Sequence, residues 1–206
     1  VTVSTMDVNG GDNITISVWA KLDIASGNTD TIIRQQPNTG NPDWLLQYNN
    51  SNEELYAGLR TDSYDELSTS INKSTFASDW QHIVMTYDGS TKTIYLNGSS
   101  VASTLNNSGN VHYDGSGTHF IGSSQGSGEF WNGKIDDVAI WQRTLSSSEV
   151  SNLYNSGNGA IVTNSANGFT NSLISYWNFD TGSGTNVPDR QSGNDGTIVS
   201  GTWTSE

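Results

Sequence analysis

The sequence predicts an all-β protein of antiparallel strands, and three observations support this. Short segments whose apolar residues recur with period two run through the chain, separated by Gly, Ser, Thr and Asn. Asp-Gly at 88–89 and Asn-Gly at 97–98 stand between such segments, and these pairs accept the positive φ angles of tight hairpin turns. A length of 206 residues suits one β-sandwich domain. We therefore expect a single domain over residues 1–206.

The clearest strand is Ile14–Leu22, in which every second residue from Ile14 onward is apolar, so that one face should be buried. The turns at 88–89 and 97–98 should join the strands between residues 80 and 105 into a three-stranded meander. The further strands that the pattern predicts are 31–36, 44–48, 55–60, 80–87, 92–96, 100–105, 119–122, 134–141, 173–180 and 196–200.

Only residues 145–154 carry a helical pattern. Ser146 is followed three positions later by Glu149, the spacing of a capping box at a helix start. A Gly- and Asn-rich link over 155–172 then leads to a strongly patterned C-terminal segment, 173–206. The helix should be short, and the link should separate it from the last strands.

The charge balance excludes two classes of partner. With 21 acidic residues against 8 basic ones, the net charge of −13 repels phosphate backbones and anionic lipid, so we expect no nucleic-acid binding.

The absence of cysteine rules out disulfides and thiol catalysis, and no apolar run reaches the ~18 residues of a membrane span. Since Val1 is not a methionine and no basic, apolar leader follows it, we expect a processed start and a secreted protein.

Three segments stand in an order and spacing that point to a family. They are 13–21 (NITISVWAK), 80–98 (WQHIVMTYDG through YLNG) and 133–141 (GKIDDVAIW), followed by the helix. Together they resemble the laminin-G-like branch of the concanavalin A-like jelly rolls. The resemblance implies an antiparallel two-sheet jelly-roll sandwich with one short helix. It also implies a family whose members bind glycans or proteins, mediate adhesion, or serve as accessory modules of glycan-active enzymes.

The C-terminal segment resembles the way such a domain begins. Residues 173–185 (LISYWNFDTGSGT) and 194–198 (NDGTI) look like opening strands displaced to the end of the chain. They can complete their own sandwich or that of a neighbouring copy. Closure within one chain is favoured because an intramolecular partner has a large effective concentration. Exchange of strands between copies remains open.

Asp136 is the candidate metal ligand. In a regular strand it shares a face with Val138 and Ile140, and a carboxylate against apolar side chains needs pairing, hydrogen bonds or a hard cation. The resemblance to the glucanase branch implies a structural Ca²⁺, for which the matching positions here are Asp136, Asp180 and Gly196. The alternatives are a β-bulge that turns Asp136 outward, or hydrogen bonds to backbone amides.

The sequence contains only weak matches to the motifs of catalytic sites. Residues 122–126 (GSSQG) match G-x-S-x-G, but no helix is predicted directly after them, as a nucleophile elbow would require. The three histidines lack the spacing of a zinc site, and His82 is expected in the core. The E-x-D-x-x-E pattern of the family's glucanases is absent, so we predict no enzyme activity.

Three aromatic residues beside polar, turn-rich segments are candidates for stacking on sugar rings: Trp44, Tyr64 and Trp131. Each also suits core or rim packing. No Lys/Arg cluster is present to neutralise sulfated or uronic glycans. A neutral glycan or a protein surface is therefore the expected partner.

The sequence thus favours a non-catalytic, calcium-stabilised adhesion or carbohydrate-binding module, outside the cell or on a cell or virion surface. Two alternatives stay open. One is a structural subunit of an extracellular or viral fibre assembled by exchange of terminal strands with neighbouring copies. The other is an accessory domain of a glycan-degrading enzyme.

Overall fold

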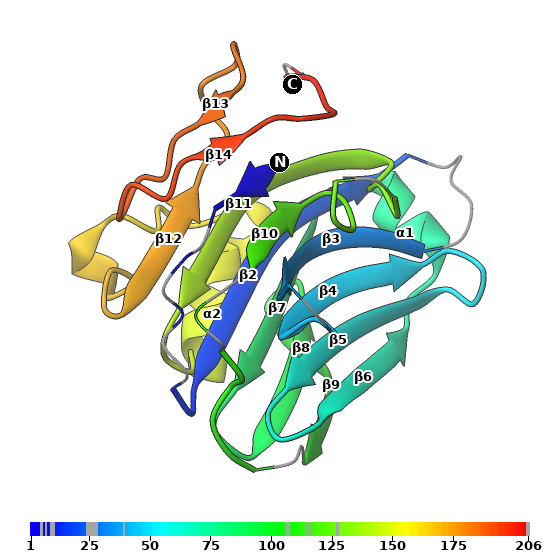
Figure 1. Ribbon diagram of the computed structural model, residues 1–206, viewed down its shortest axis with the longest axis vertical. Helices are drawn as coiled ribbons and strands as arrows, with labels where there is room; N and C mark the ends of the chain where they lie inside the picture. The colour runs from blue at the N-terminus through cyan, green and yellow to red at the C-terminus, as the bar shows by residue number, and fades with distance from the viewer. Residues whose placement is uncertain are drawn as a thin grey trace.

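The structure is a computed structural model that describes residues 1–206 apart from positions 5, 7, 9–10, 24–28, 39, 106–107, 114, 116, 127 and 205–206. The described residues form two antiparallel sheets packed face to face (Figure 1). One sheet has eight strands and the other has six. This confirms the predicted all-β, two-sheet sandwich.

The eight-stranded sheet has the order β13 (Asn186–Val187), β14 (Gly196–Thr197), β1 (Thr2–Val3), β10 (Thr118–Ile121), β3 (Thr29–Gln36), β4 (Trp44–Asn49), β5 (Glu54–Arg60) and β6 (Tyr64–Ser70). The six-stranded sheet has the order β12 (Leu173–Trp177), β11 (Gly133–Trp141), β2 (Ile14–Leu22), β7 (Gln81–Tyr87), β8 (Thr91–Leu96) and β9 (Ser99–Leu105). The helical segments are α1 (Lys73–Ser78), α2 (Ser147–Tyr154), η1 (Asn155–Gly157) and η2 (Ser165–Asn167). None of the described helices has the length and apolar character needed to cross a bilayer.

Local sequence signals placed several elements correctly. Strands β7, β8 and β9 are neighbours and form the predicted meander, with Asn97 and Gly98 at positive φ in its second turn. Ser146 caps α2, and its side chain and that of Glu149 complete the capping box. The sequence did not predict the two-residue strands β1 and β13, the segments η1 and η2, helix α1 or strand β6. Helix α1 has no side-chain cap, and β6 is a polar edge strand whose sequence lacks apolar alternation.

Two apolar clusters hold the molecule together. The larger lies between the sheets and is filled by the inward residues of both, including the fully buried Trp177. The second lies on the outer face of the six-stranded sheet, under α2 and the 155–172 link. There Trp141 Nε1 donates to the Phe169 carbonyl at 2.6 Å, so the Gly/Asn-rich link is packed against the sheet.

The C-terminal segment pairs with the body of the same chain. Strand β12 runs antiparallel to β11, and β14 runs antiparallel to β1, which brings the two ends of the chain together (Figure 1). Trp177 Nε1 donates to the Asn194 carbonyl at 3.0 Å and so ties β12 to the loop before β14. Exchange of this segment between copies stays a prediction.

Asp189 organises the loop beside β12. Its carboxylate accepts hydrogen bonds from the backbone N–H groups of Tyr176, Gln191, Ser192 and Asn194, at 2.9–3.3 Å. Burial by itself would raise the pKa of Asp189, but these hydrogen bonds outweigh it and lower the pKa below its ordinary value. Because β12 is an edge strand, the loop also covers backbone groups that would otherwise face another chain.

Candidate functional site

A β-bulge in β11 sets the direction of the carboxylates at the site. Asp136 pairs with Trp19 and Ala139 pairs with Ser17, so three steps along β11 match two along β2. Asp137, at φ 45°, is the extra residue. Asp136 therefore shares the outer face of the sheet with Trp19. The expectation that Asp136 faces the apolar side with Val138 is wrong, because the bulge shifts the alternation by one residue.

Two aspartates at the bulge are held in place by hydrogen bonds. Asp136 Oδ1 accepts from the N–H of Asp137 at 2.8 Å. The Tyr176 hydroxyl donates to Asp137 Oδ1. Burial raises the pKa of Asp137, and the charge of Asp180 raises it further, although the Tyr176 hydrogen bond opposes both. The bulge thus gathers negative charge beside β12.

The residues predicted to hold calcium fit a common site only in part. Asp136 and Asp180 both act electrostatically on Tyr176 and so lie in one region, with Asp180 exposed and hydrogen-bonded to Asn178. Gly196 lies in the other sheet, paired with Val3, where an added Cβ would come within 2.6 Å of Val1 Cγ1. Among the described residues, no three His, Cys, Asp or Glu side chains form a group that could hold a metal ion.

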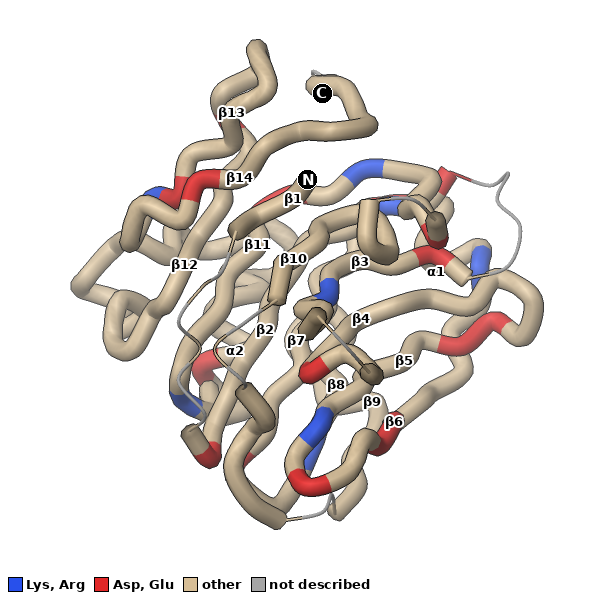
Figure 2. Tube along the Cα trace, in the orientation of Figure 1, with Lys and Arg blue, Asp and Glu red and all other residues tan. Residues whose placement is uncertain are grey.

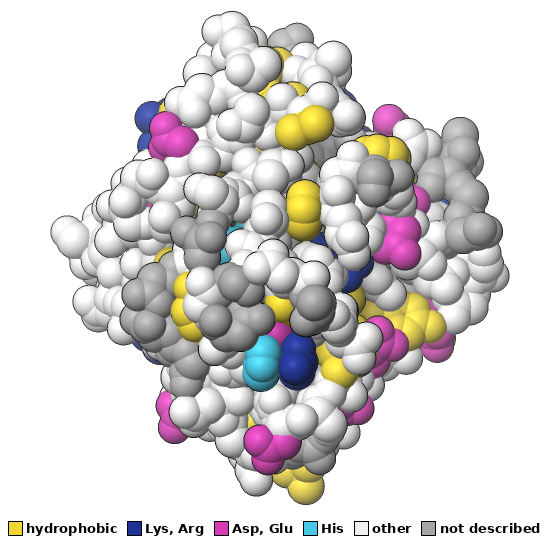
Figure 3. All heavy atoms as spheres, in the orientation of Figure 1, with side chains coloured by type: hydrophobic (Ala, Val, Ile, Leu, Met, Phe, Trp, Pro, Cys, Tyr) yellow, Lys and Arg dark blue, Asp and Glu magenta, His cyan; other side chains and the backbone are white. Residues whose placement is uncertain are grey.

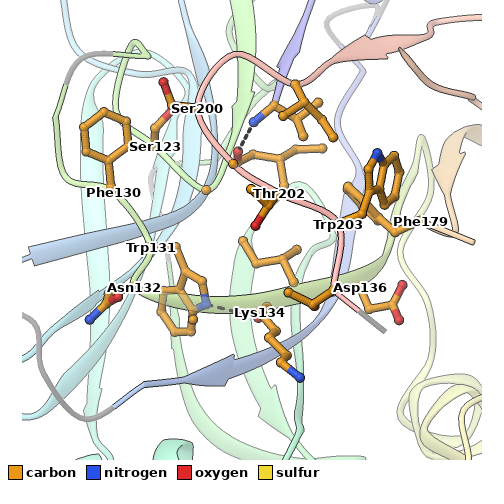
Figure 4. Close-up of a pocket in the computed structure, with 18 of the residues that line it drawn as sticks. Ser123, Phe130, Trp131, Asn132, Lys134, Asp136, Phe179, Ser200, Thr202 and Trp203 are labelled. Carbon is orange, nitrogen blue, oxygen red and sulfur yellow. Dashed lines mark hydrogen bonds between the residues drawn. The ribbon is translucent and has the colours of Figure 1, made fainter. Parts of the chain in front are cut away.

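A cleft of about 420 Å³ opens where β11, the connection from β10 to β11 and the C-terminal tail meet (Figure 4). Its lining combines residues 121–136 with the C-terminal tail and with residues near the N-terminus, which are far apart in sequence. We call this space the cleft, and the residues that matter for its chemistry are Trp80, Phe130, Trp131, Asn132, Lys134, Asp136, Phe179, Ser200, Thr202 and Trp203.

Aromatic rings lie on two sides of the cleft. Phe130 and Trp131 stand on one side, and Phe179 and Trp203 on the other (Figure 4). Trp131 Nε1 donates to the Lys134 carbonyl at 3.1 Å, while Phe130 is 45% exposed and offers more of its ring to solvent. The Phe179 and Trp203 ring centroids are 6.3 Å apart. These rings give the cleft apolar surfaces fixed by packing and hydrogen bonds.

Polar groups complete the lining. Asn132, Lys134 and Asp136 are among the residues that line the cleft, as are Ser200 and Thr202 of the tail. Rigid apolar walls with a few placed hydrogen-bonding groups are typical of small-molecule binding sites. The arrangement suits a ligand with both apolar faces and many hydroxyls.

A second, smaller space of about 140 Å³ adjoins the cleft on the outer face of the six-stranded sheet. We call it the outer hollow, and it is lined by Trp19, Trp80, Asp136, Asp137, Gly157, Asn158 and Gly159. Its floor is rigid because Trp19 stacks with Tyr154 at 5.8 Å and contacts His82 at 5.0 Å between ring centroids.

His82 is buried, as expected from its position in a strand, and packs against Trp19 in the floor of the outer hollow. Its Nε2 is hydrogen-bonded to Ser17 Oγ at 2.8 Å. Burial lowers the pKa of His82 to about 3, so the ring is neutral at physiological pH.

The three predicted stacking residues have different positions. Trp131 lines the cleft. Trp44 is 1% exposed in the core between the sheets, so no ring face is left for a sugar. Tyr64 lies on the edge strand β6, where its hydroxyl donates to Glu66 Oε1 at 2.7 Å and its ring covers Gly58.

Sequence reasoning missed four aromatic residues of the site: Trp80, Phe130, Phe179 and Trp203. The one sequence signal for any of them is that Trp203 is the single aromatic residue in a tail rich in Gly, Ser and Thr. The G-x-S-x-G match lies in the connection between β10 and β11, with no helix after it. Ser124 Oγ accepts a hydrogen bond from Arg34 at 2.7 Å, a structural role for that serine.

Comparisons agree with the fold. The family described as the Concanavalin A-like lectin/glucanases superfamily (Laminin_G_3) matches residues 1–151, about three quarters of the chain. The chain therefore belongs to this family, which contains both lectins and glucanases. Among curated proteins, no relative matches the chain significantly.

Several solved structures share the fold. A Bacteroides ovatus protein, for which carbohydrate binding has been proposed, matches with a TM-score of 0.69 at 15% identity, over 95% of this chain and 54% of that one. A heptameric SAP-like pentraxin from Limulus polyphemus matches at 0.55 and 23% identity, over 77% and 74%. The binding domain of botulinum neurotoxin DC in complex with SialylT matches at 0.57 and 18%, over 75% and 38%. This chain thus spans about half of the Bacteroides protein.

Proposed function

We propose that this chain is a non-catalytic carbohydrate-binding module and that the cleft is its binding site. The observation that carries the proposal is the pairing of aromatic walls with Asn132, Lys134 and Asp136 in one space of about 420 Å³. Aromatic rings present flat apolar faces, and amides and carboxylates bond the hydroxyls around a sugar. Family membership supports a lectin role, and the absent glucanase motif supports a role without catalysis.

The charge distribution favours an uncharged glycan. Asp23 and Asp136 line the cleft together with a single basic side chain, Lys134. Over the described part of the chain, Lys and Arg are scattered rather than clustered (Figure 2). The face drawn in Figure 3 is mostly uncharged, with acidic side chains spread across it. Such a surface repels sulfated or uronic glycans at low salt.

A glycan array followed by calorimetry tests the proposal. The chain should bind one or more neutral glycans, and Phe130→Ala or Trp203→Ala should weaken binding by about fivefold, since ring contacts of this kind are worth on the order of 1 kcal/mol. Leu105→Ala is a matched control, because Leu105 is 80% exposed on β9, outside the cleft. Binding that all three variants retain would place the site elsewhere. No binding on the array would remove the proposed function.

We also propose calcium as a stabilising ion. The support is the family resemblance alone, because Asp136, Asp137 and Asp180, which all act electrostatically on Tyr176, do not form a metal-binding group among the described residues. Gly196 gives no further support, because it lies in the other sheet, paired with Val3. Added CaCl₂ should raise the melting temperature relative to EDTA, because an ion that binds only the folded state stabilises it. Equal melting temperatures in the two buffers would remove calcium from the proposal.

A secreted or surface location and a role in adhesion follow from this function as proposals. Size-exclusion chromatography separates the module from its main alternative. A monomer supports a binding module. Ladders or filaments would support a fibre subunit whose β12–β14 segment is exchanged between copies. If the chain is instead an accessory domain of a glycan-degrading enzyme, it should bind the same glycans, and the catalytic domain should lie in another part of a larger protein.

A further inference from the structure

The cleft and the outer hollow meet at two residues, Trp80 and Asp136, which line both spaces. Trp80 is half-buried and immediately precedes β7, while Asp136 lies at the bulge of β11. The two spaces therefore adjoin at these two residues. The bulge creates this continuity, because a regular β11 would have turned Asp136 toward the core.

The outer hollow has the lining of a binding site of its own. Trp19 and Trp80 supply aromatic surface, and the carboxylates of Asp136 and Asp137 and the amide of Asn158 supply hydrogen-bonding groups. Gly159 lies beside Trp19 at φ 66°, a left-handed conformation, and an added Cβ would make an ordinary contact with Trp19 Nε1 at 3.7 Å. A side chain at this left-handed position would both strain the backbone and occupy the hollow.

We propose that the outer hollow is a second sugar subsite, so that the binding site takes a linear, uncharged oligosaccharide that crosses Trp80 and Asp136 rather than a single terminal sugar. The inference rests on the proposed function of the cleft. At least one sugar unit lies in the larger cleft, and the next unit lies in the outer hollow. The carboxylate of Asp136 is positioned to accept hydroxyl hydrogens from either side of the crossing.

The chemistry of the crossing selects an uncharged chain. Asp136 and Asp137 place two carboxylates at the outer hollow, and its lining contains no basic side chain. A uronic, sulfated or sialylated unit there would meet like charge. The lining is also preorganised, because the Tyr176 hydroxyl holds Asp137 and Tyr154 stacks on Trp19. A preorganised subsite loses little entropy when the ligand binds.

Calorimetry with neutral gluco-, xylo- and manno-oligosaccharides, from single sugars to hexasaccharides, tests the proposal. The affinity for the preferred series should rise by about tenfold once the chain is long enough to span both spaces, and then level off. An affinity that does not change with chain length would overturn the second subsite while leaving the cleft as the binding site. Binding of no sugar at any length would overturn the proposed function as well.

Three variants separate the two spaces. Asn158 lines the outer hollow but not the cleft, and its side chain also donates to the Asn155 carbonyl; Asn158→Ala should lower the affinity for long chains by about fivefold and leave single sugars unchanged. Phe130→Ala should weaken binding at every length, and Trp80→Ala should weaken binding and abolish the length dependence. Ile161→Ala is the control, because Ile161 is 68% exposed on the same link as Asn158 and lines neither space. An Asn158→Ala effect equal for all lengths would contradict the subsite.

Discussion

The two sides of the sandwich where its sheets end are closed in different ways. At the side formed by β6 and β8, Lys92 is fully buried, and its ammonium donates to the Asp65 carbonyl at 2.8 Å and lies 3.5 Å from the Asp65 carboxylate. At the opposite side, the C-terminal segment adds β12 to one sheet and β13 and β14 to the other. The edge strands β6 and β9 approach each other closely and close the first side together with this ion pair, whereas more than thirty residues cover the second.

The difference explains where the cleft lies. Regular strands interdigitate their side chains and leave little space between sheets. The tail after β14 crosses the edge as irregular chain, so its contacts with β11 are intermittent and a cavity of about 420 Å³ remains. The binding site therefore belongs to the side whose closure depends on the segment farthest along the sequence. Four predictions test this contrast.

The largest effect should come from the tail's core anchor. Trp177→Ala removes a fully buried indole and should lower the free energy of unfolding by about 4 kcal/mol. Urea denaturation measures the change. Trp203→Ala, which truncates a partly buried ring of the same tail, should cost less than about 1 kcal/mol. Similar losses for both variants would mean that the tail is not anchored through Trp177.

Acid should destabilise the folded state through His82, which lies in β7, the first strand of the meander. Its folded pKa of about 3 lies below the unfolded value near 6.5, so only the unfolded chain gains a proton between these pH values. Stability should therefore fall with decreasing pH by about 1 kcal/mol per unit below pH 6.5. His82→Gln should remove that part of the slope between pH 6.5 and 4.5. An unchanged slope in the variant would show that His82 does not titrate as its burial implies.

Asp189 should govern the exposed side of β12. Asp189→Ala leaves several N–H groups without an acceptor and should lower stability by about 2 kcal/mol. Because the folded pKa is below the ordinary value, the carboxylate stabilises the fold above about pH 4 and loses this effect as the pH falls further. The control is Asp62→Ala, at an exposed carboxylate outside this loop. If the two losses are equal, the Asp189 loop does not hold the edge.

The smallest effect on stability should come from replacing the buried Lys92 at the other side of the sandwich. Lys92→Met keeps the length and apolar volume of the side chain and removes the desolvated ammonium. Burial lowers the pKa of Lys92, which shows that the site disfavours the charge, although Asp65 opposes this. The change in unfolding free energy should stay within about 1 kcal/mol. A loss comparable to that of Trp177→Ala would mean that the ion pair, rather than packing, closes this side.

Local patterns in the sequence were enough for the body of the fold. The meander followed from two dipeptide turns, and α2 followed from Ser146 and Glu149, because each signal acts over a few residues. Helix α1 could not be predicted in this way. It is six residues long without a cap, and it is fixed by the burial of Phe76, a contact that the local sequence does not specify.

The site was harder to predict because its residues come from separate parts of the chain. Trp44 and Trp131 both belong to the core cluster, yet only Trp131, 7% exposed, also lines the cleft. Which of them faces a ligand depends on the sheet that each strand joins and on what covers it. Asp136 shows the same limit, since one extra residue in β11 changed its face, and only the pairing with β2 reveals that residue.

By itself the sequence determined the strands, the capped helix, the family resemblance and the acidic character that favours an uncharged ligand, because periodicity, capping and charge are properties of neighbouring residues or of the whole chain. Only the tertiary structure decided how the tail closes the sandwich, which way the bulge turns Asp136, and that Trp80 joins two spaces. These features arise from pairing between segments more than a hundred residues apart, such as β1 with β14. Such pairing depends on the shape of the assembled sheets rather than on any local pattern.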